Sequence, residues 1–300
     1  MLLHDRYAII GVFQKSKGVT PIAIRIVTDS TCDLSPEDQI RLDVQVIPLT
    51  VHFSGVSYLD GIELTKENFY HKLETNEKLP TTSQISPQTF TDAFEKHLEA
   101  GDEVVGIFIS GEISGTYDSS CIAKKMLNSD KLFMIDSRSA TMGLALLVSE
   151  AAKKRDAGCT ANEIAEHITG LTKKIRFLAA VNTLKYLRKG GRISAASAMV
   201  GEVLGVKPIV TIQDGSIHSI GKARGMNAAL KSILDRASKD FPDLRYEVAF
   251  AHSLVPDLAQ KAIEMFKEPL QLTDWITCSI GSVIGTYSGK GAIGFAYIAQ

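Results

Sequence analysis

The 300-residue sequence predicts an α/β fold made of two α/β domains, and three features indicate it. Over residues 22–172, strand-like runs alternate with helix-like stretches, which is the pattern of a doubly wound, mainly parallel sheet. After about residue 175 the rhythm changes, and Asp214-Gly215 stands between two strand-like runs as in a β-hairpin, so the second domain is expected to hold a mixed sheet with helices. The length also suits two hydrophobic cores.

The elements of the first domain, residues 22–174, follow from short apolar runs and from helix-start signals. Strands are expected where β-branched or fully apolar runs end at turn residues, namely at 22–27, 44–53 (interrupted by Pro48), 104–109 and 132–135. Helices are expected to open at Ser35-Pro36, near Lys66, at Ser86-Pro87, near Tyr117 and at the capping box that begins with Thr160. A further long helix is expected between the strand at 132–135 and Gly158, where it ends. The polar segment 80–84 has no periodicity and is expected to be a loop.

The second domain, residues 175–300, is expected to alternate strands with helices. Its strands are predicted at 177–181, 209–212, 216–220, 246–252, 274–280 and 293–298, and its helices at 195–204, 226–239 and 256–267. No Pro/Gly linker separates the domains near 173–176, so we expect them to pack closely with a cleft between them. Residues 1–21 lack a small-residue cleavage site and are interpreted as a poorly ordered extension.

Composition excludes several function classes. The net charge is −1, from 33 basic and 34 acidic side chains, so no nucleic-acid partner is expected. The chain contains no run of about 18 apolar residues, so no membrane-spanning helix is predicted. The four cysteines are scattered along the sequence, which is typical of free thiols in the cytoplasm. The seven histidines form no metal-binding motif, so no metal is expected. Residues 289–294 match the glycine spacing of a dinucleotide-binding loop, but too few residues follow them to form the helix that such a loop requires, so no cofactor is expected.

Two Ser/Thr-rich segments and one basic cluster are candidate sites. Residues 81–84 and 110–116 each lie between a predicted sheet element and a helix start, where hydroxyl groups either bind an anion or simply cap the helix. The cluster at 187–194 places Arg188, Lys189 and Arg192 beside two glycines. This cluster is either an anion site or docking surface, or a solvated turn.

Taken together, these segments resemble the DegV family along nearly the whole chain from Ile24. The matching stretches are Ile26–Leu34, Tyr58–Gly61, Thr81–Gln84, Ser114–Tyr117, Lys189–Ile193 and the glycine-rich C-terminus. The resemblance implies a carrier, not an enzyme, that holds one long-chain fatty acid in an apolar tunnel between its domains. It also implies a partner, a separate fatty acid kinase that phosphorylates the carboxylate, and it leaves room for transient membrane contact.

The resemblance also implies which residues bind the carboxylate. Thr82 and Ser114 would hold it, and Arg192 would lie close to the head group or to the kinase-facing surface. Tyr287 stands where the family usually has a histidine, and it can donate a hydrogen bond without a charge. Two further positions depart from the family pattern, since Lys290 and Ile85 both stand where a proline is usual.

Binding alone suffices for such a role, because burying about fourteen methylenes is worth roughly 11 kcal/mol. The alternative is a hydrolase or acyltransferase that uses Ser114 as nucleophile, for which His252 is the histidine we would nominate as base. A purely regulatory interaction protein is a third hypothesis, and it predicts no bound lipid.

Overall fold

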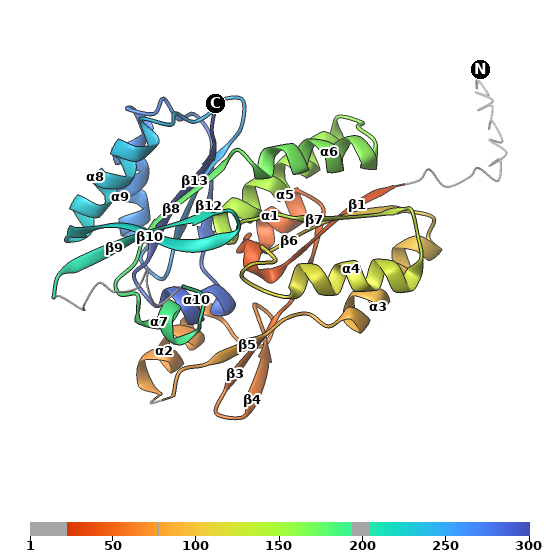
Figure 1. Cartoon of the computed structure of the whole chain (residues 1–300), viewed down its shortest axis with the longest axis horizontal. Coiled ribbons are helices and arrows are strands. Elements are labelled where there is room, and N and C mark those ends of the chain that lie inside the picture. The colour runs from red at the N-terminus through yellow and green to blue at the C-terminus, as the bar shows by residue number, and fades with distance from the viewer. Residues whose placement is uncertain (1–22, 77, 194–203) are drawn as a thin grey trace, which may run out of the picture.

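The computed structural model describes residues 23–76, 78–193 and 204–300 and confirms an α/β fold, which is built on three β-sheets. Figure 1 shows a four-stranded sheet on the right, a six-stranded sheet on the left and a three-stranded sheet below them. The extension expected at 1–21 and almost all of the helix expected at 195–204 lie outside the described residues.

The four-stranded sheet is wholly parallel and has helices on both faces, as predicted. Its order is β2-β1-β6-β7, with β1 Ile24–Asp29, β2 Val44–Ile47, β6 Glu103–Phe108 and β7 Leu132–Asp136. Successive side chains point to opposite faces, so Ile26 joins one apolar core and Val27 another. Helices α3 (Pro87–Glu99) and α4 (Thr116–Leu127) cover one face, and α5 (Thr141–Asp156) and α6 (Ala161–Thr172) cover the other.

The six-stranded sheet is mixed, which confirms the second prediction. Its order is β10-β9-β8-β13-β11-β12, with β8 Ile175–Ala180, β9 Val206–Gln213, β10 Ser216–Arg224, β11 Val248–His252, β12 Trp275–Ser279 and β13 Ile293–Ile298. Strands β9 and β10 form the predicted hairpin across Asp214-Gly215, and only β11 and β12 pair in parallel. Helices α8 (Met226–Ala237) and α9 (Pro256–Lys267) cover one face.

Helix α5 lies between the two large sheets and joins their cores. It packs against β1 and β6 on one side and against β11, β12 and β13 on the other. Nine consecutive residues, Thr141 to Ser149, are buried, which is expected only of a helix covered all round. One hydrophobic core therefore runs from Ile26 of the first sheet through α5 to Ala249 of the second.

The third sheet corrects two predictions. Residues 44–53 are not one strand, because Pro48 has no N–H for a ladder and the chain passes there from β2 into β3 (Thr50–Phe53) of another sheet. Residues 80–84 are not a loop, since β5 (Thr81–Ser83) pairs with β3, which also pairs with β4 (Val56–Leu59). The partner of β5 lies about 30 residues away, so no local pattern marks this strand.

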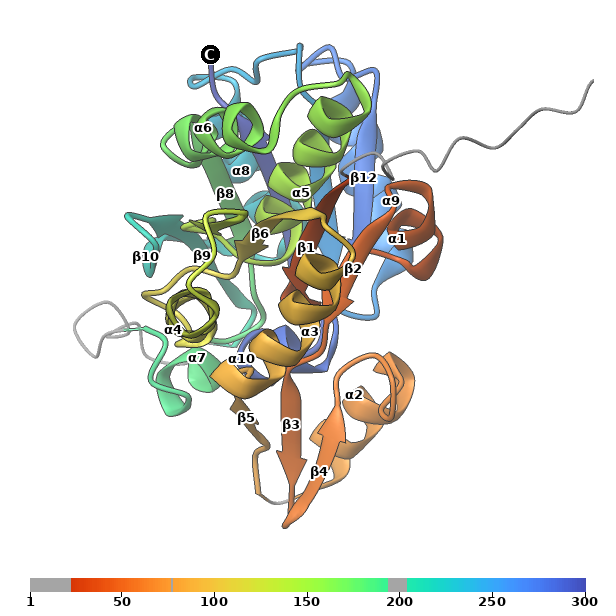
Figure 2. The ribbon, with the colours of Figure 1, turned by 90° about the vertical axis from the view of Figure 1, so that its right-hand side faces the viewer.

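Five short elements complete the fold. They are η1 (Ser30–Cys32), α1 (Pro36–Arg41), α2 (Lys66–Thr75), α7 (Lys185–Lys189) and α10 (Ser282–Ser288). Helices α7 and α10 were not predicted, because each is too short to show a helical period. Figure 2 shows both of them above the three-stranded sheet. No helix within the described ranges is long and apolar enough to cross a membrane.

Candidate functional site

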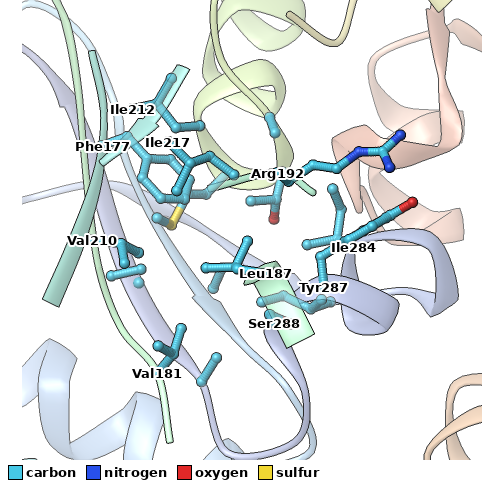
Figure 3. A pocket seen from close by; sticks show the side chains of 18 of the residues that line it. Phe177, Val181, Leu187, Arg192, Val210, Ile212, Ile217, Ile284, Tyr287 and Ser288 are labelled. Atoms are coloured by element: carbon cyan, nitrogen blue, oxygen red, sulfur yellow. The ribbon is translucent and has the colours of Figure 1, made fainter. Parts of the chain in front are cut away.

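An apolar cavity with an empty volume of about 670 Å³ lies between the start of α5, one face of the six-stranded sheet and α10. Figure 3 shows the wall of the cavity, which contains Phe177 from β8, Val210 and Ile212 from β9, and Ile217 from β10. Because almost all of the lining is hydrocarbon, the cavity suits an apolar ligand.

Small residues create the space inside this wall. Ala179, Ala251 and Gly294 line the cavity at places where larger side chains would fill it. A Cβ atom on Gly294 would lie 2.4 Å from the Cε atom of Met142, so this glycine lets Met142 lie close against β13. The shape of the cavity wall therefore depends on a glycine near the start of the buried strand β13.

A polar cleft, with an empty volume of about 920 Å³, adjoins the apolar cavity. It is lined by residues 78–82, by Tyr186, Lys189 and Gly190, and by Thr286 of α10. Arg192 and Tyr287 line both the cleft and the cavity. The two spaces thus meet at a cation and a phenol, and in Figure 3 these two side chains lie together at one side of the cavity.

Thr82, Tyr287 and Arg192, three residues distant in sequence, are in contact where the two spaces meet. The hydroxyl groups of Thr82 and Tyr287 share a hydrogen bond of 2.7 Å, and the Arg192 guanidinium carbon lies 4.7 Å from the centre of the Tyr287 ring. Arg192 also donates to the carbonyl oxygens of Gly190, at 2.7 Å, and Ile113, at 3.3 Å. A Cβ on Gly190 would lie 2.4 Å from the ring of Tyr287, so this glycine makes room for the phenol.

Ser114, the fourth predicted residue, is close to the cavity but is not part of its lining. Its neighbour Ile113 lines the cavity, while the Ser114 hydroxyl shares a hydrogen bond of 2.9 Å with that of Thr116 and accepts one of 3.3 Å from the Thr116 N–H. These contacts place Ser114 just before α4, whose N-cap residue is Gly115. The structure therefore brings three of the four predicted residues together and leaves Ser114 beside them.

Two buried carboxylates that sequence reasoning did not assign a role hold the N-terminus of α10, the helix that carries Tyr287. Asp33 Oδ1 accepts from the Gly281 N–H at 2.7 Å, and Asp60 Oδ1 accepts from the Ser282 N–H at 3.0 Å. Burial raises the pKa of Asp33 to about 7, and the nearby charge of Lys66 opposes that rise. Both acids lie in stretches that resemble the DegV family, and this resemblance could have marked them as candidate site residues. It could not have shown that they contact the start of α10.

Helix α10 is also held from the side by α2. A Cβ on Gly285 would lie 2.5 Å from the ring of Phe69 and 2.8 Å from the hydroxyl oxygen of Tyr70, so the two helices touch at this glycine. The two other departures from the family pattern lie apart from this contact. Lys290 forms an ion pair of 3.0 Å with Glu74, and Ile85 is buried in the core under α3.

The structure does not join the nucleophile and base that the hydrolase alternative requires. The Val255 N–H donates to His252 Nδ1 at 3.4 Å, and burial and the charge of Lys66 lower the pKa of His252. No hydrogen bond links the described side chains of Ser114 and His252, whose hydrogen-bond partners are Thr116 and Val255. Within the described ranges, no group of three or more His, Cys, Asp or Glu could hold a metal ion.

Sequence comparison relates this chain to one family over most of its length. The profile of uncharacterised proteins of the DegV family matches residues 23–300. A DegV domain-containing protein of Caldanaerobacter subterraneus subsp. tengcongensis is 37% identical over 273 residues, which cover 90% of this chain and 97% of that protein. Another, of Clostridium acetobutylicum, is 35% identical over 281 residues, which cover 92% of this chain and 99% of that protein.

Solved structures share the fold. DegV of Bacillus subtilis, described as a fatty acid binding protein, has a TM-score of 0.81 and 29% identity, with 93% of this chain and all of that one covered. A second solved structure is that of a DegV family protein of Thermus thermophilus for which fatty acid binding is described. Its TM-score is 0.83 and its sequence is 28% identical, with 93% of this chain and 100% of that one covered. A DegV lipid binding protein of Thermotoga maritima has a TM-score of 0.84 and 26% identity, covering 93% and 99%.

Proposed function

Because the chain belongs to the DegV family, we propose that it binds one long-chain fatty acid, with the acyl chain in the apolar cavity and the carboxylate beside Arg192 and Tyr287. The observation that carries this proposal is the junction of a hydrocarbon-lined space with a polar cleft at a cation and a phenol. We place the ligand between two domains, residues 22–174 and 175–300, since the wall comes from the start of α5 and from the six-stranded sheet.

The acyl chain supplies the affinity. Burial of about fourteen methylenes is worth roughly 11 kcal/mol, at about 0.8 kcal/mol each. A carboxylate taken from water costs several kcal/mol, and each charge-assisted hydrogen bond returns on the order of 1.5–3 kcal/mol. The polar residues therefore fix the position of the head group and offset its desolvation.

Thr82 and Tyr287 are suited to a carboxylate because each hydroxyl has one hydrogen to donate. In their mutual bond of 2.7 Å one of these hydrogens is used between them. A bound carboxylate would accept from both, so one neutral bond is replaced by two charge-assisted ones. We assign Arg192 and Ser114 to the same head group, with the Ser114 hydroxyl turning from Thr116 to the ligand.

We further propose that the protein is a non-catalytic carrier that presents the carboxylate to a separate fatty acid kinase in the cytoplasm. The exposed cations Arg188 and Lys189 of α7 lie beside the polar cleft and would face that partner. The four cysteines are free thiols, which is typical of a reducing compartment. Arg188→Ala with Lys189→Ala should retain lipid and lose acyl-phosphate formation in a reconstituted assay, and unchanged phosphorylation would contradict the docking surface.

Native mass spectrometry of the purified protein tests the binding proposal. We expect a mass increase of one acyl chain per protomer, and fatty acid in the organic extract. A protein that carries no lipid and shows no mass shift after fatty acid is added would contradict the proposal. Assaying the same protein on acyl esters tests the alternative, since turnover would favour the hydrolase.

A further inference from the structure

A row of small residues crosses the floor of the apolar cavity, which is the face of the six-stranded sheet toward α5. In the strand register, Ala179 of β8 pairs with Gly294 of β13, and Gly294 pairs with Ala251 of β11. Directly paired residues point to the same face of a sheet, and all three line the cavity. Phe177, two residues before Ala179 and on the same face, is much larger. The three small residues therefore form a trough that runs across the strands.

Met142 stands over the middle of this trough. It is the second residue of α5, it lines the cavity from the side opposite the sheet, and it is fully buried. Its Sδ atom lies 2.7 Å from the position that a Cβ atom on Gly294 would take. The thioether therefore occupies the space that a side chain at residue 294 would fill, with Ala179 and Ala251 on the strands to either side.

Only the side chain of Met142 is free to change this contact. The backbone of Met142 belongs to α5, which is packed between the two large sheets, and Gly294 belongs to β13, which is paired on both edges. A methionine side chain is unbranched, turns about three bonds and fills irregular gaps. The width of the cavity at its middle is therefore set by the conformation of one flexible side chain.

Width at the middle distinguishes two kinds of acyl chain. A saturated chain or one with a trans double bond is straight, whereas a cis double bond bends the chain and requires more room there. A thioether that lies in the trough packs against a straight chain, and one that turns aside leaves the trough to a bend. Flexible methionines allow other binding surfaces to accept several ligands in the same way.

We propose that Met142, which lies against Gly294, determines acyl selectivity and lets the one cavity bind straight and bent chains about equally well. The inference rests on the proposed fatty-acid binding and names its substrate class, which is saturated and cis-monounsaturated long-chain fatty acids alike. Met142 is thus a specificity-determining residue for the acyl chain, separate from the head-group residues Thr82, Arg192 and Tyr287.

Competition binding tests this with stearic acid, oleic acid and elaidic acid, which is the straight trans isomer of oleic acid. The wild-type protein should bind all three within a factor of about three, which corresponds to less than about 1 kcal/mol. Met142→Ala leaves a permanent hollow above Gly294 that only a bent chain fills. This variant should therefore prefer oleic acid over the other two by about tenfold, or about 1.4 kcal/mol.

Gly294→Ala changes the same contact from the opposite side. The new Cβ takes the place of the thioether, which then stands in the cavity and excludes a bend. The preference should therefore reverse, so that stearic and elaidic acids bind about tenfold more tightly than oleic acid. Should Gly294→Ala fail to fold, the result for Met142→Ala alone decides.

Met134→Ala is the matched control. The Cε atom of Met134 also lies against a glycine, 3.1 Å from the position of a Cβ on Gly106, but Met134 is not part of the cavity wall. Its relative affinities should equal those of the wild-type protein.

Three results would overturn the role of Met142 and leave fatty-acid binding standing. They are a wild-type preference of more than threefold between stearic and oleic acid, unchanged relative affinities in Met142→Ala, and the same shift in Met134→Ala as in Met142→Ala. If the wild-type protein binds none of the three acids, the proposed function fails and this inference fails with it.

Discussion

The apolar cavity and the polar cleft adjoin at two residues, but they are built in opposite ways. The wall of the cavity is one face of a sheet, to which β8 and β9 contribute two side chains each and β10 contributes Ile217. The junction with the cleft depends on single residues, with Thr82 from β5, Tyr287 from α10 and Arg192 after α7. The comparison indicates that affinity is spread over many apolar groups, whereas the position of the head group depends on a few polar ones.

Filling the cavity should have the largest effect. Ile212→Trp places an indole in the space of the acyl chain, and the loss of contact for about four methylenes would weaken binding by about 3 kcal/mol or more. Fatty-acid affinity from competition binding measures this. Ile220→Trp on β10 is the control, because Ile220 packs on the opposite face of the sheet, against the core under α8. Equal losses in both variants would show that the fold, not the cavity, is affected.

The second prediction concerns the anchor of α10. Because burial raises the pKa of Asp33 from 3.8 to about 7, the folded protein keeps a proton that the unfolded chain loses between these pH values. Stability should therefore fall as pH rises from about 4 to about 7 and level off above, by on the order of 2–3 kcal/mol between pH 5 and 8. Asp33→Asn keeps an acceptor for Gly281 and should make the curve flatter.

Urea unfolding at several pH values measures this slope. Burial also raises the pKa of Asp29 to about 6, so a smaller slope of the same sign should remain in Asp33→Asn. The exposed Asp130→Asn serves as control. An Asp33→Asn curve that matches the wild-type curve would show that Asp33 does not titrate in this range.

The third prediction concerns the head group. Tyr287→Phe and Thr82→Ala should each weaken fatty-acid binding by about 1–3 kcal/mol, since each removes a donor to a charged group. The double variant should lose less than the sum, because the two hydroxyls already share a bond. Calorimetry on the two single variants and the double variant measures the loss of binding free energy in each. If the loss in the double variant equals the sum of the two single losses, the two hydroxyls do not share a ligand atom.

Ser114→Ala sharpens the same comparison. If the hydroxyl turns to the carboxylate, this variant should also lose about 1–3 kcal/mol of binding. Wild-type affinity together with a lower melting temperature would instead assign Ser114 to the start of α4, where it contacts Thr116.

The smallest effect is a pH dependence introduced at residue 287. If a neutral phenol donor contacts the carboxylate, wild-type affinity should be nearly flat between about pH 5.5 and 8, whereas an imidazole ordinarily titrates near 6.5. Tyr287→His should bind more tightly toward the acid end, as the imidazole gains charge beside the carboxylate. Flat and identical curves for both proteins would show that residue 287 does not touch the head group.

Much of the fold was determined by the sequence itself. The run Val104–Ile109, the capping box at Thr160 and the Asp214-Gly215 turn are local signals, and each predicted an element that the structure contains. The motifs around Thr82, Arg192 and Tyr287 also identified residues that meet in space. Local signals suffice here because hydrophobic period, capping and turn chemistry act between residues close in sequence.

Tertiary structure alone decided the rest. Strand β5 exists because β3 pairs with it from about 30 residues away, and α10 is a helix because Asp33 and Asp60 hold its first N–H groups. The contacts of Thr141 and Asp33, and the close approach of Met142 to Gly294, likewise join distant segments. Such contacts leave no periodic trace in the chain, since they depend on which surfaces meet when the sheets pack around α5.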